Sequence, residues 1–390
     1  MPTRPRPDLS KRDALIITAP GLEAVTRHEL SALGLTVTGE EPGALSAALA
    51  PRDVMRANLH LRTASRVVIR LADFRALTFA DVERHAKRVP WETVVAAGQR
   101  VRFRVTCRKS RLYHSGAVAQ RLAEALAVRV PGVVPATSAA DEEADGGEEE
   151  LFVVRLFRDH LTLSADTSGE LLHRRGYRQA TAKAPLRETL AAAMLLGAGW
   201  DGSVPLVDPM CGSGTIAIEA AMIARRMAPG RARRFAFERW PGHDATLWRD
   251  VRAAATAEER EAAGVPIVAS DRDAGAVTAA TSNATRAGVV ADVEVRRQSL
   301  SALKAPEGKG VLLVNPPYGM RVGEKAPLRN LFAQLGNIAR GEAAGWRLGM
   351  LSADRDLERQ VRLPFRVCWS STNGGIPVRF IVAEVPNDGR

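Results

Sequence analysis

The stretch 204–221 constrains the fold of this chain most, because it joins a short apolar strand to a helix through a glycine turn. It reads Val-Pro-Leu-Val-Asp-Pro-Met-Cys-Gly-Ser-Gly-Thr-Ile-Ala-Ile-Glu-Ala-Ala. The apolar strand ends at Asp208, and Gly212 and Gly214 allow the backbone to turn sharply and approach a ligand closely. The helix that starts at Thr215 presents free N–H groups to that ligand. The stretch therefore predicts a small-molecule site.

The order of acid and glycines indicates which small molecule binds. A dinucleotide turn reads G-x-G-x-x-G and is followed by an acid, whereas here the carboxylate precedes the glycines. A carboxylate in this place suits a cationic, hydroxyl-bearing ligand, and S-adenosylmethionine has a sulfonium, an ammonium and ribose hydroxyls but no phosphate. The residues expected to contact this cofactor are Asp208, Pro209, Cys211, Gly212, Ser213, Gly214 and Thr215. Cys211 is interpreted as a small residue of the turn and not as a nucleophile.

A second apolar strand, 311–314, stops at Asn315-Pro-Pro-Tyr318. Prolines end a sheet ladder, and the carboxyl ends of parallel strands are where open α/β sheets bind ligands. Asn-Pro-Pro-Tyr resembles the motif of amino-methyltransferases. The resemblance implies that the Asn oxygen and the first proline's carbonyl accept hydrogen bonds from an NH2 group, while the Tyr ring stacks on the base. The candidate catalytic residues are Asn315, Pro316, Pro317 and Tyr318, and Asn315 also counts among the cofactor neighbours. The alternative is a rigid turn that only ends the strand.

The second half of the chain alternates strands with helices, which predicts a doubly wound sheet. Its seven expected strands are 206–207, 266–269, 293–295, 311–314, 347–351, 365–368 and 378–385. Asp271 follows the second strand and is the acid expected to hold the ribose hydroxyls, whereas Asp273 reads as a helix N-cap. After the third strand, Gln298 or Ser299 is the candidate for the adenine contact.

The first half predicts two small α+β units. Residues 12–72 alternate short strands and helices in a pattern that favours a small ferredoxin-like domain. In the strand 100–105, arginines alternate with apolar residues, which gives one basic face, and a basic loop and a helix over 115–128 follow. This combination over 73–168 resembles the THUMP domain, an RNA-binding module. The candidate RNA-binding residues are Arg100, Arg102, Arg104, Lys109, Arg111, Arg174 and Arg175. The alternative for the arginine face is an ordinary solvated strand.

Four motifs occur in a characteristic order: the connector His173-Arg-Arg-Gly-Tyr-Arg178, an Ala-Pro-Leu-Arg-Glu helix start at 184–188, the glycine turn and Asn-Pro-Pro-Tyr. Together they resemble the THUMP-bearing guanine-N2 RNA methyltransferases, which are class I enzymes that use S-adenosylmethionine. The resemblance implies an α/β fold with a seven-stranded doubly wound, Rossmann-like sheet and an α+β N-terminal region. The implied domains are a ferredoxin-like domain at 12–72, a THUMP domain at 73–168, a linker at 169–184 and a methyltransferase domain at 185–390.

The insertion 228–240 looks more like the ribosomal branch of the family than the tRNA branch. It interleaves Arg231, Arg233 and Arg234 with two phenylalanines and a tryptophan. Arginine beside aromatic rings suits single-stranded RNA. The alternative is that these rings pack the insertion onto the sheet while the arginines are solvated. The expected substrate is therefore large-subunit (23S) rRNA, ahead of tRNA.

Charge supports a nucleic acid partner. The net charge is +11, although residues 141–150 carry seven carboxylates and no base. We interpret that acidic tract as a solvated loop. The chain has no apolar run of membrane-spanning length and no apolar signal region, and its three scattered cysteines form no metal motif. We expect a cytoplasmic monomer without a metal, and no membrane partner.

Three other functions fit parts of this pattern. A tRNA guanine-N2 methyltransferase shares all the motifs, and an adenine-N6 DNA methyltransferase shares the Asn-Pro-Pro-Tyr motif. A non-catalytic RNA-binding assembly factor is disfavoured because the glycine turn and Asn315 are intact.

Overall fold

The computed structural model describes residues 11–136, 149–179, 186–317 and 325–387, which are grouped into two compact units. Unit 1 contains Met1–Thr18, Leu30–Leu172 and Arg233–Ala253. Unit 2 contains Ala19–Glu29, His173–Ala232 and Ala254–Arg390. The predicted Tyr318 and most of the acidic tract lie outside the described residues.

Unit 1 is built on one sheet, which has eight strands among the described residues in the order β2-β3-β1-β4-β8-β7-β5-β6. The strands are β1 (Arg12–Thr18), β2 (Val37–Glu41), β3 (Ala44–Leu49), β4 (Ala64–Arg75), β5 (Arg100–Arg108), β6 (Val134–Pro135), β7 (Glu150–Phe157) and β8 (His160–Asp166). β4 pairs with β1 over its first half and with β8 along most of its length. The stretches 12–72 and 73–168, expected as separate domains, therefore share a sheet.

From β1 to β4 the chain has the element order β-α-β-β-α-β of a ferredoxin-like fold. The helices in this order are α1 (Glu23–Ala32), most of which is grouped with unit 2, and α2 (Pro51–His60). Pro51 stands in the first turn of α2, where a missing N–H costs nothing. Leu35-Thr-Val37 predicts a strand in the sequence, and the corresponding strand is β2, displaced toward the C-terminus. β3 was not predicted, because Ala-Leu-Ser-Ala-Ala-Leu has no clear period of two.

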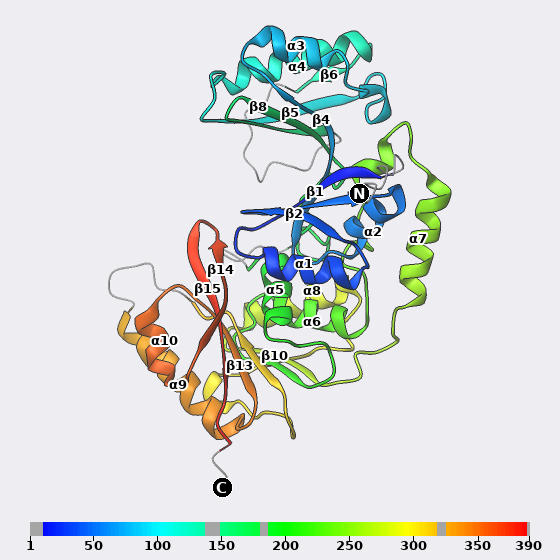
Figure 1. Cartoon of the computed structure of the whole chain (residues 1–390). Helices are drawn as coiled ribbons and strands as arrows, with labels where there is room; N and C mark the ends of the chain where they lie inside the picture. The colour runs from blue at the N-terminus through cyan, green and yellow to red at the C-terminus, as the bar shows by residue number, and fades with distance from the viewer. Residues whose placement is uncertain (1–10, 137–148, 180–185, 318–324, 388–390) are drawn as a thin grey trace, which may run out of the picture. The chain divides into compact units, whose positions relative to one another are not determined.

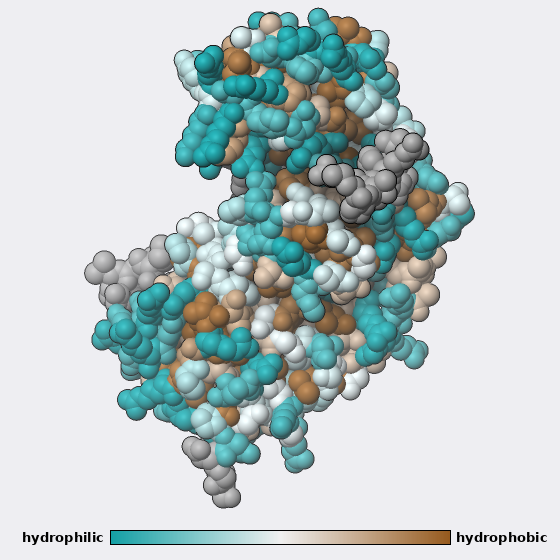
Figure 2. Space-filling model, viewed as in Figure 1, coloured by the Kyte–Doolittle hydropathy of each residue, from teal (hydrophilic) through white to brown (hydrophobic). Residues whose placement is uncertain are grey.

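The rest of unit 1 packs α3 (Phe79–Ala86) and α4 (Ser115–Arg129) on the sheet (Figure 1). Thr78 caps α3 and exchanges hydrogen bonds with Asp81 in a capping box. The core is built around Trp91, whose ring meets those of Phe103 and Phe152. In the space-filling view, hydrophilic residues cover much of the visible surface over α3 and α4 (Figure 2).

Part of the insertion at 228–240 belongs to unit 1 and is packed. Phe235 is 1% exposed and stacks on Phe237, and Trp248 of α7 (Ala245–Ala257) meets both rings edge-on. Arg233 is buried and donates to the backbone oxygens of Ser168 and Leu171. Packing, as the alternative expected, therefore describes Phe235 and Phe237, although their partner is Trp248. Arg233 is buried and not solvated as that alternative expected, and the RNA-binding interpretation is wrong for these three side chains.

Unit 2 contains the predicted sheet, with seven strands among the described residues in the order β11-β10-β9-β12-β13-β15-β14. The strands are β9 (Leu206–Asp208), β10 (Ile267–Asp271), β11 (Glu294–Arg297), β12 (Val311–Val314), β13 (Arg347–Ser352), β14 (Arg366–Asn373) and β15 (Ile376–Glu384). The first five are parallel and β15 is antiparallel to both of its neighbours. The predicted strands and the doubly wound class are confirmed.

Helices cover both faces of this sheet because each buried strand is apolar on both sides. Leu206 packs with α5 (Glu188–Gly197), α6 (Thr215–Ala224) and α8 (Ala274–Ala287), whereas Val207 packs on the other face with α9 (Lys325–Glu342) and α10 (Arg355–Val361). Figure 1 shows α9 and α10 next to each other in orange. The parallel strands thus end at one edge, where the order β10-β9-β12 brings three of their carboxyl ends together.

Among the described residues, the helices are too short or too polar to cross a membrane.

Candidate active site

β9 ends at this edge of the sheet with a buried acid. Asp208 is 1% exposed, and its Oδ1 accepts a hydrogen bond of 3.2 Å from the backbone N–H of Met210. Its Oδ2 has no hydrogen-bond partner among the described residues. Burial raises the pKa of Asp208 to about 8, outweighing the Met210 N–H, which lowers it. A buried acceptor of this kind suits a ligand that brings a cation or an N–H donor.

The glycine turn that follows has the backbone that only glycine adopts easily. Gly214 is the N-cap of α6 with a φ of +83°, and a Cβ there would lie 2.9 Å from the Cβ of Ala280. Gly212 has a φ of +51°, and its N–H donates a hydrogen bond of 3.0 Å to Oδ2 of Asp271. The turn is thus tied to the end of β10.

Cys211 sits inside the turn and is 7% exposed. Burial raises the pKa of its thiol far above the ordinary value, so the side chain stays neutral. Its backbone N–H donates to the carbonyl of Ser270. These features agree with a small packing residue.

Helix α8 supports the turn from behind. The side-chain amide of Asn283 donates a 2.9 Å hydrogen bond to the carbonyl of Ser213. Arg286, one turn later, donates to Oδ1 of Asn283 and, over 2.7 Å, to the carbonyl of Tyr177. Asn283 is 0% exposed, so the bond to Ser213 is shielded from water. Sequence reasoning missed this support, because an Asn inside a helix carries no local signal of its partner.

The connector 173–178 is part of the same buried network. Arg175 is 3% exposed and lies 3.5 Å from the carboxylate of Glu219, which also accepts a 3.2 Å hydrogen bond from the hydroxyl of Tyr177. Arg178 donates to Oγ1 of Thr215, the first residue of α6, over 2.8 Å. The prediction that Arg175 contacts RNA is therefore wrong, because its guanidinium is buried against an acid.

A second acid at this edge of the sheet lies at the end of β10. Asp271 accepts hydrogen bonds from the backbone N–H groups of Gly212 and Asp273, which fixes its carboxylate in place. Asp273 caps α8 through a 2.8 Å hydrogen bond from the N–H of Ala276, so its predicted role as N-cap is confirmed.

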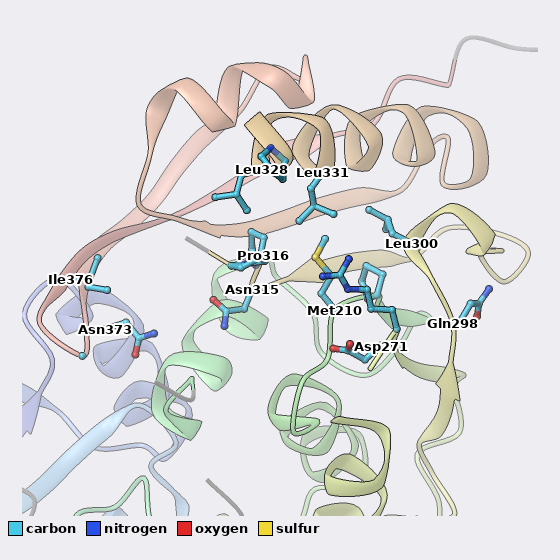
Figure 3. A pocket seen from close by; sticks show the side chains of 15 residues that line it. Met210, Asp271, Gln298, Leu300, Asn315, Pro316, Leu328, Leu331, Asn373 and Ile376 are labelled. Atoms are coloured by element: carbon cyan, nitrogen blue, oxygen red, sulfur yellow. The ribbon is translucent and has the colours of Figure 1, made fainter. Parts of the chain in front are cut away.

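These strand ends open into a cavity of about 640 Å³. Figure 3 shows Asn315 and Pro316, at the end of β12, between Asp271 on one side and Asn373 on the other. The predicted residues that line the cavity are Pro209, Asp271, Gln298, Asn315, Pro316 and Pro317. The other predicted turn residues and Ser299 do not line it, and Oγ of Ser299 instead meets that of Ser301. The cavity is large enough for a cofactor next to a flat substrate.

Part of the cavity wall was not predicted. On the cofactor side the additional residues are Met210, Arg272 and Leu300, and on the Asn315 side they are Pro327, Leu328, Leu331, Asn373, Gly374 and Ile376. Asn373 is 6% exposed and starts the turn between β14 and β15, where Gly374 and Gly375 both have positive φ. Asn-Gly-Gly marks a hairpin turn in a sequence, but nothing local shows that this hairpin reaches Asn315.

The predicted RNA-binding residues of unit 1 differ in exposure. Lys109 and Arg111 are exposed. Arg100 is also exposed and pairs with Glu149 over 3.1 Å. Arg102 is 8% exposed and lies 3.5 Å from the same acid, so the prediction of an RNA contact at Arg102 is wrong. The strand therefore does not present the continuous face of exposed arginines that was expected. In unit 2, Arg174 is half-buried.

Within the described ranges, no group of three or more His, Cys, Asp or Glu residues is placed to hold a metal ion.

Comparison with known families decides the class of this site. Residues 175–378 match the UPF0020 family, described as an RMKL-like methyltransferase domain. The chain belongs to this methyltransferase family. Residues 13–68 match the RlmL ferredoxin-like domain, which confirms the predicted ferredoxin-like region. The predicted enzyme class, a methyltransferase, is confirmed as well.

Several relatives match over nearly the whole chain, and two of them show the range of their lengths. A protein of Synechocystis sp. (strain ATCC 27184 / PCC 6803 / Kazusa), named "Putative RNA methyltransferase slr0064", is 32% identical over 94% of this chain and 95% of its own length. The "Ribosomal RNA large subunit methyltransferase K/L" of Marinomonas sp. (strain MWYL1) is 34% identical over 94% of this chain but only 52% of its own length. The chain thus spans about half the length of the K/L relatives.

Solved structures agree with this assignment. The putative methyltransferase SMU.472, solved in complex with SAH, is 30% identical with a TM-score of 0.85, covering 96% of this chain and 98% of its own. A predicted N6-adenine-specific DNA methylase of Listeria monocytogenes str. 4b F2365 is 28% identical with a TM-score of 0.84, covering 96% of this chain and 97% of its own.

Proposed function

We propose that this chain transfers a methyl group from S-adenosylmethionine to the exocyclic N2 amine of a guanosine in RNA, and that its substrate is large-subunit rRNA. One observation carries the proposal: Asn315 and Pro316 line the same cavity as Asp271 and Gln298. The first pair are the amine acceptors implied by the motif, and the second pair are the expected cofactor contacts.

The residues around the glycine turn fit the cofactor. The unpartnered oxygen of Asp208 accepts from the cationic end of S-adenosylmethionine, and the fixed carboxylate of Asp271 holds the ribose hydroxyls. Gln298 lies at the cavity wall and its backbone N–H donates to the carbonyl of Asp271, which supports Gln298 as the candidate for the adenine contact. S-adenosylmethionine supplies an electrophilic methyl group, and a similar structure solved with SAH supports this choice of cofactor.

The chain's own contribution to the reaction is to position the amine. The lone pair of guanine N2 is delocalised into the ring, so the amine is a poor nucleophile. Acceptance of its two N–H bonds by Oδ1 of Asn315 and the carbonyl of Pro316 directs the lone pair toward the methyl group and stabilises positive charge developing on nitrogen. Tyr318, which lies outside the described residues, is expected to stack on the base. No general base is required, because the methylated amine is acidic and loses its proton to water.

RNA as the substrate is supported by the N-terminal half of the chain. Residues 12–72 supply the ferredoxin-like domain, residues 73–168 act as a THUMP domain, and the linker 169–184 leads to the methyltransferase domain at 185–390. The relatives named as RNA methyltransferases share both the N-terminal and the catalytic parts. A base inside a helix has to leave its stack to enter the cavity, which favours loops and frayed stems. We place the enzyme in the cytoplasm, acting as a monomer.

Adenine-N6 methylation of DNA is the second candidate, because a similar structure carries that predicted activity in its title and Asn-Pro-Pro-Tyr serves both amines. The test is transfer of labelled methyl groups to total RNA and to DNA, followed by nucleoside analysis. The proposal predicts label in N2-methylguanosine of large-subunit rRNA. Label in tRNA would correct the substrate, and label in N6-methyladenine of DNA would overturn the proposal. No label in any of these, from protein that binds S-adenosylmethionine, would favour a non-catalytic assembly factor.

A further inference from the structure

Unit 1 exposes a tyrosine, Tyr113, whereas the aromatic rings at the centre of its core are buried. Tyr113 is 71% exposed, whereas Trp91 and Phe152 are 0% and 1% exposed. Its ring lies against that of His114, with centroids 4.1 Å apart. Both residues belong to the loop between β5 and α4. A single exposed aromatic residue is ordinary on a protein surface, so its surroundings decide whether it has a role.

The loop is fixed in place on both sides of Tyr113. Leu112 is 7% exposed and packs into the core of unit 1. Before it, the N–H of Arg111 donates a 2.7 Å hydrogen bond to Asp159, and the N–H of Asp159 donates to Oγ of Ser110 over 3.0 Å. After it, the carbonyl of His114 accepts the N–H of Val118 in the first turn of α4. Tyr113 is therefore held outward by a rigid support, which lowers the entropy cost of stacking on its ring.

The loop that carries Tyr113 is basic. Arg108, Lys109 and Arg111 are exposed and lie within five residues of Tyr113, with no acid in between. The backbone N–H of Arg158 donates to the carbonyl of Arg108, so a fourth cation belongs to the adjacent turn, with its guanidinium 5.2 Å from the centre of the Phe157 ring. None of these four cations forms an ion pair with a carboxylate among the described residues. The nearby carboxylate of Asp159 accepts the backbone N–H of Arg111 instead.

We propose that Tyr113 and His114 form a base-stacking platform for single-stranded RNA, with the four cations of this loop and the adjacent turn on the phosphates. Every base has an aromatic face, so an exposed ring pair binds single strands with little dependence on sequence, and the cations follow the backbone. Duplex RNA keeps its bases stacked inside and cannot use the ring. The platform rests on the proposed function in that RNA is the partner, and it adds that the RNA segment docked here is unpaired.

The test measures binding of a short labelled RNA of mixed sequence, single-stranded or annealed to its complement, by fluorescence anisotropy. The full-length variants are Tyr113→Ala, Tyr113→Phe and the control Val128→Ala, which shortens a side chain on α4 that is 73% exposed. Tyr113→Ala should weaken single-strand binding about five-fold or more. Phenylalanine should preserve it, because the ring and not the hydroxyl stacks. Duplex binding should not change in any variant.

Salt dependence separates stacking from charge. Tyr113→Ala removes no cation, so the slope of log affinity against log salt should match the wild type even though the affinity falls. Equal single-strand affinities for Tyr113→Ala and Val128→Ala would overturn the platform. A loss shared equally by single strands and duplex would overturn it too. Nucleoside analysis at saturating RNA distinguishes a failure of this proposal from a failure of the proposed function. Methylation of guanine N2 by Tyr113→Ala tests the proposed function, and its outcome does not depend on the platform.

Discussion

Two basic stretches of this chain have similar sequences and opposite environments. The connector contains Arg174, Arg175 and Arg178, and the loop after β5 contains Lys109 and Arg111. In the connector, Arg175 is buried against Glu219, and Arg178 donates a hydrogen bond to Thr215. In the loop, both side chains are exposed and form no ion pair within the described residues. The connector's cations hold the methyltransferase unit together, whereas the loop's cations are available to a polyanion.

The largest expected difference between the two stretches is in stability. Arg175→Gln leaves the fully buried Glu219 without its cation, and breaking such a pair typically costs about 3–5 kcal/mol. Lys109→Gln should change the free energy of unfolding by less than about 0.5 kcal/mol. Denaturant unfolding of full-length protein measures both. The double variant Arg175→Met/Glu219→Leu should recover most of the loss, and an Arg175→Gln variant as stable as the wild type would refute the buried pair.

Asp208 is a buried acid without a connector arginine beside it. The free energy of unfolding should therefore depend on pH. Its pKa is raised to about 8, so the folded protein binds a proton that the unfolded chain releases near pH 4. Its contribution to stability is thus present below pH 4 and is lost as the pH rises to about 8.

We expect Asp208→Asn, compared with the wild type without cofactor, to be more stable at pH 8 and less dependent on pH between 4 and 8. Thermal unfolding across this range measures the difference. The same variant should bind S-adenosylmethionine more weakly, since an amide cannot take the negative charge that a bound cation would stabilise on Asp208. Parallel pH profiles for the two proteins would show that Asp208 is not the group responsible.

A smaller effect is expected where the buried network meets the glycine turn. Asn283→Ala removes the amide that holds the carbonyl of Ser213, and a buried hydrogen bond of this kind is worth about 1–3 kcal/mol. The affinity for S-adenosylmethionine should fall several-fold by calorimetry, while RNA affinity stays unchanged. Asn283→Asp, which also removes the donor, should not rescue it, whereas Asn283→Gln should in part. Unchanged cofactor affinity in Asn283→Ala would mean that the turn keeps its shape unaided.

The smallest effect distinguishes individual exposed cations. Each of Lys109→Gln and Arg111→Gln should lower the slope of log RNA affinity against log salt by about 0.7, the value for one phosphate contact to a single strand. Arg100→Gln should change it less, because Arg100 already pairs with Glu149. Binding titrations at several salt concentrations provide the slopes. Equal slopes in all three variants would contradict the contrast between paired and available cations.

The sequence predicted the features that are determined by residues close together along the chain. The seven strands of unit 2, the glycine turn and the cap at Asp273 each depend on residues a few positions apart, and the structure contains them. What it did not predict depends on distant partners. The burial of Arg175 requires Glu219, and the charge pattern of the connector alone resembles that of a solvated loop.

Long-range pairing accounts for the other differences. β4 continues past residue 72 to pair with β8, so the ferredoxin-like strands and those that follow form one sheet. Asn373 joins the cavity only because the sheet order ends with β13-β15-β14, which no local feature of the hairpin specifies. The rings of the 228–240 insertion pack onto Trp248, whose position the insertion's own sequence does not indicate.

The central claim is that Asn315 accepts the target amine while the glycine turn and Asp271 hold the cofactor. The most direct measurement compares Asn315→Ala with the wild type in two assays: calorimetry with S-adenosylmethionine, and labelled methyl transfer to large-subunit rRNA followed by nucleoside analysis. We predict that Asn315→Ala binds the cofactor nearly as well as the wild type and forms no N2-methylguanosine. Formation of N2-methylguanosine at close to the wild-type rate would contradict the account.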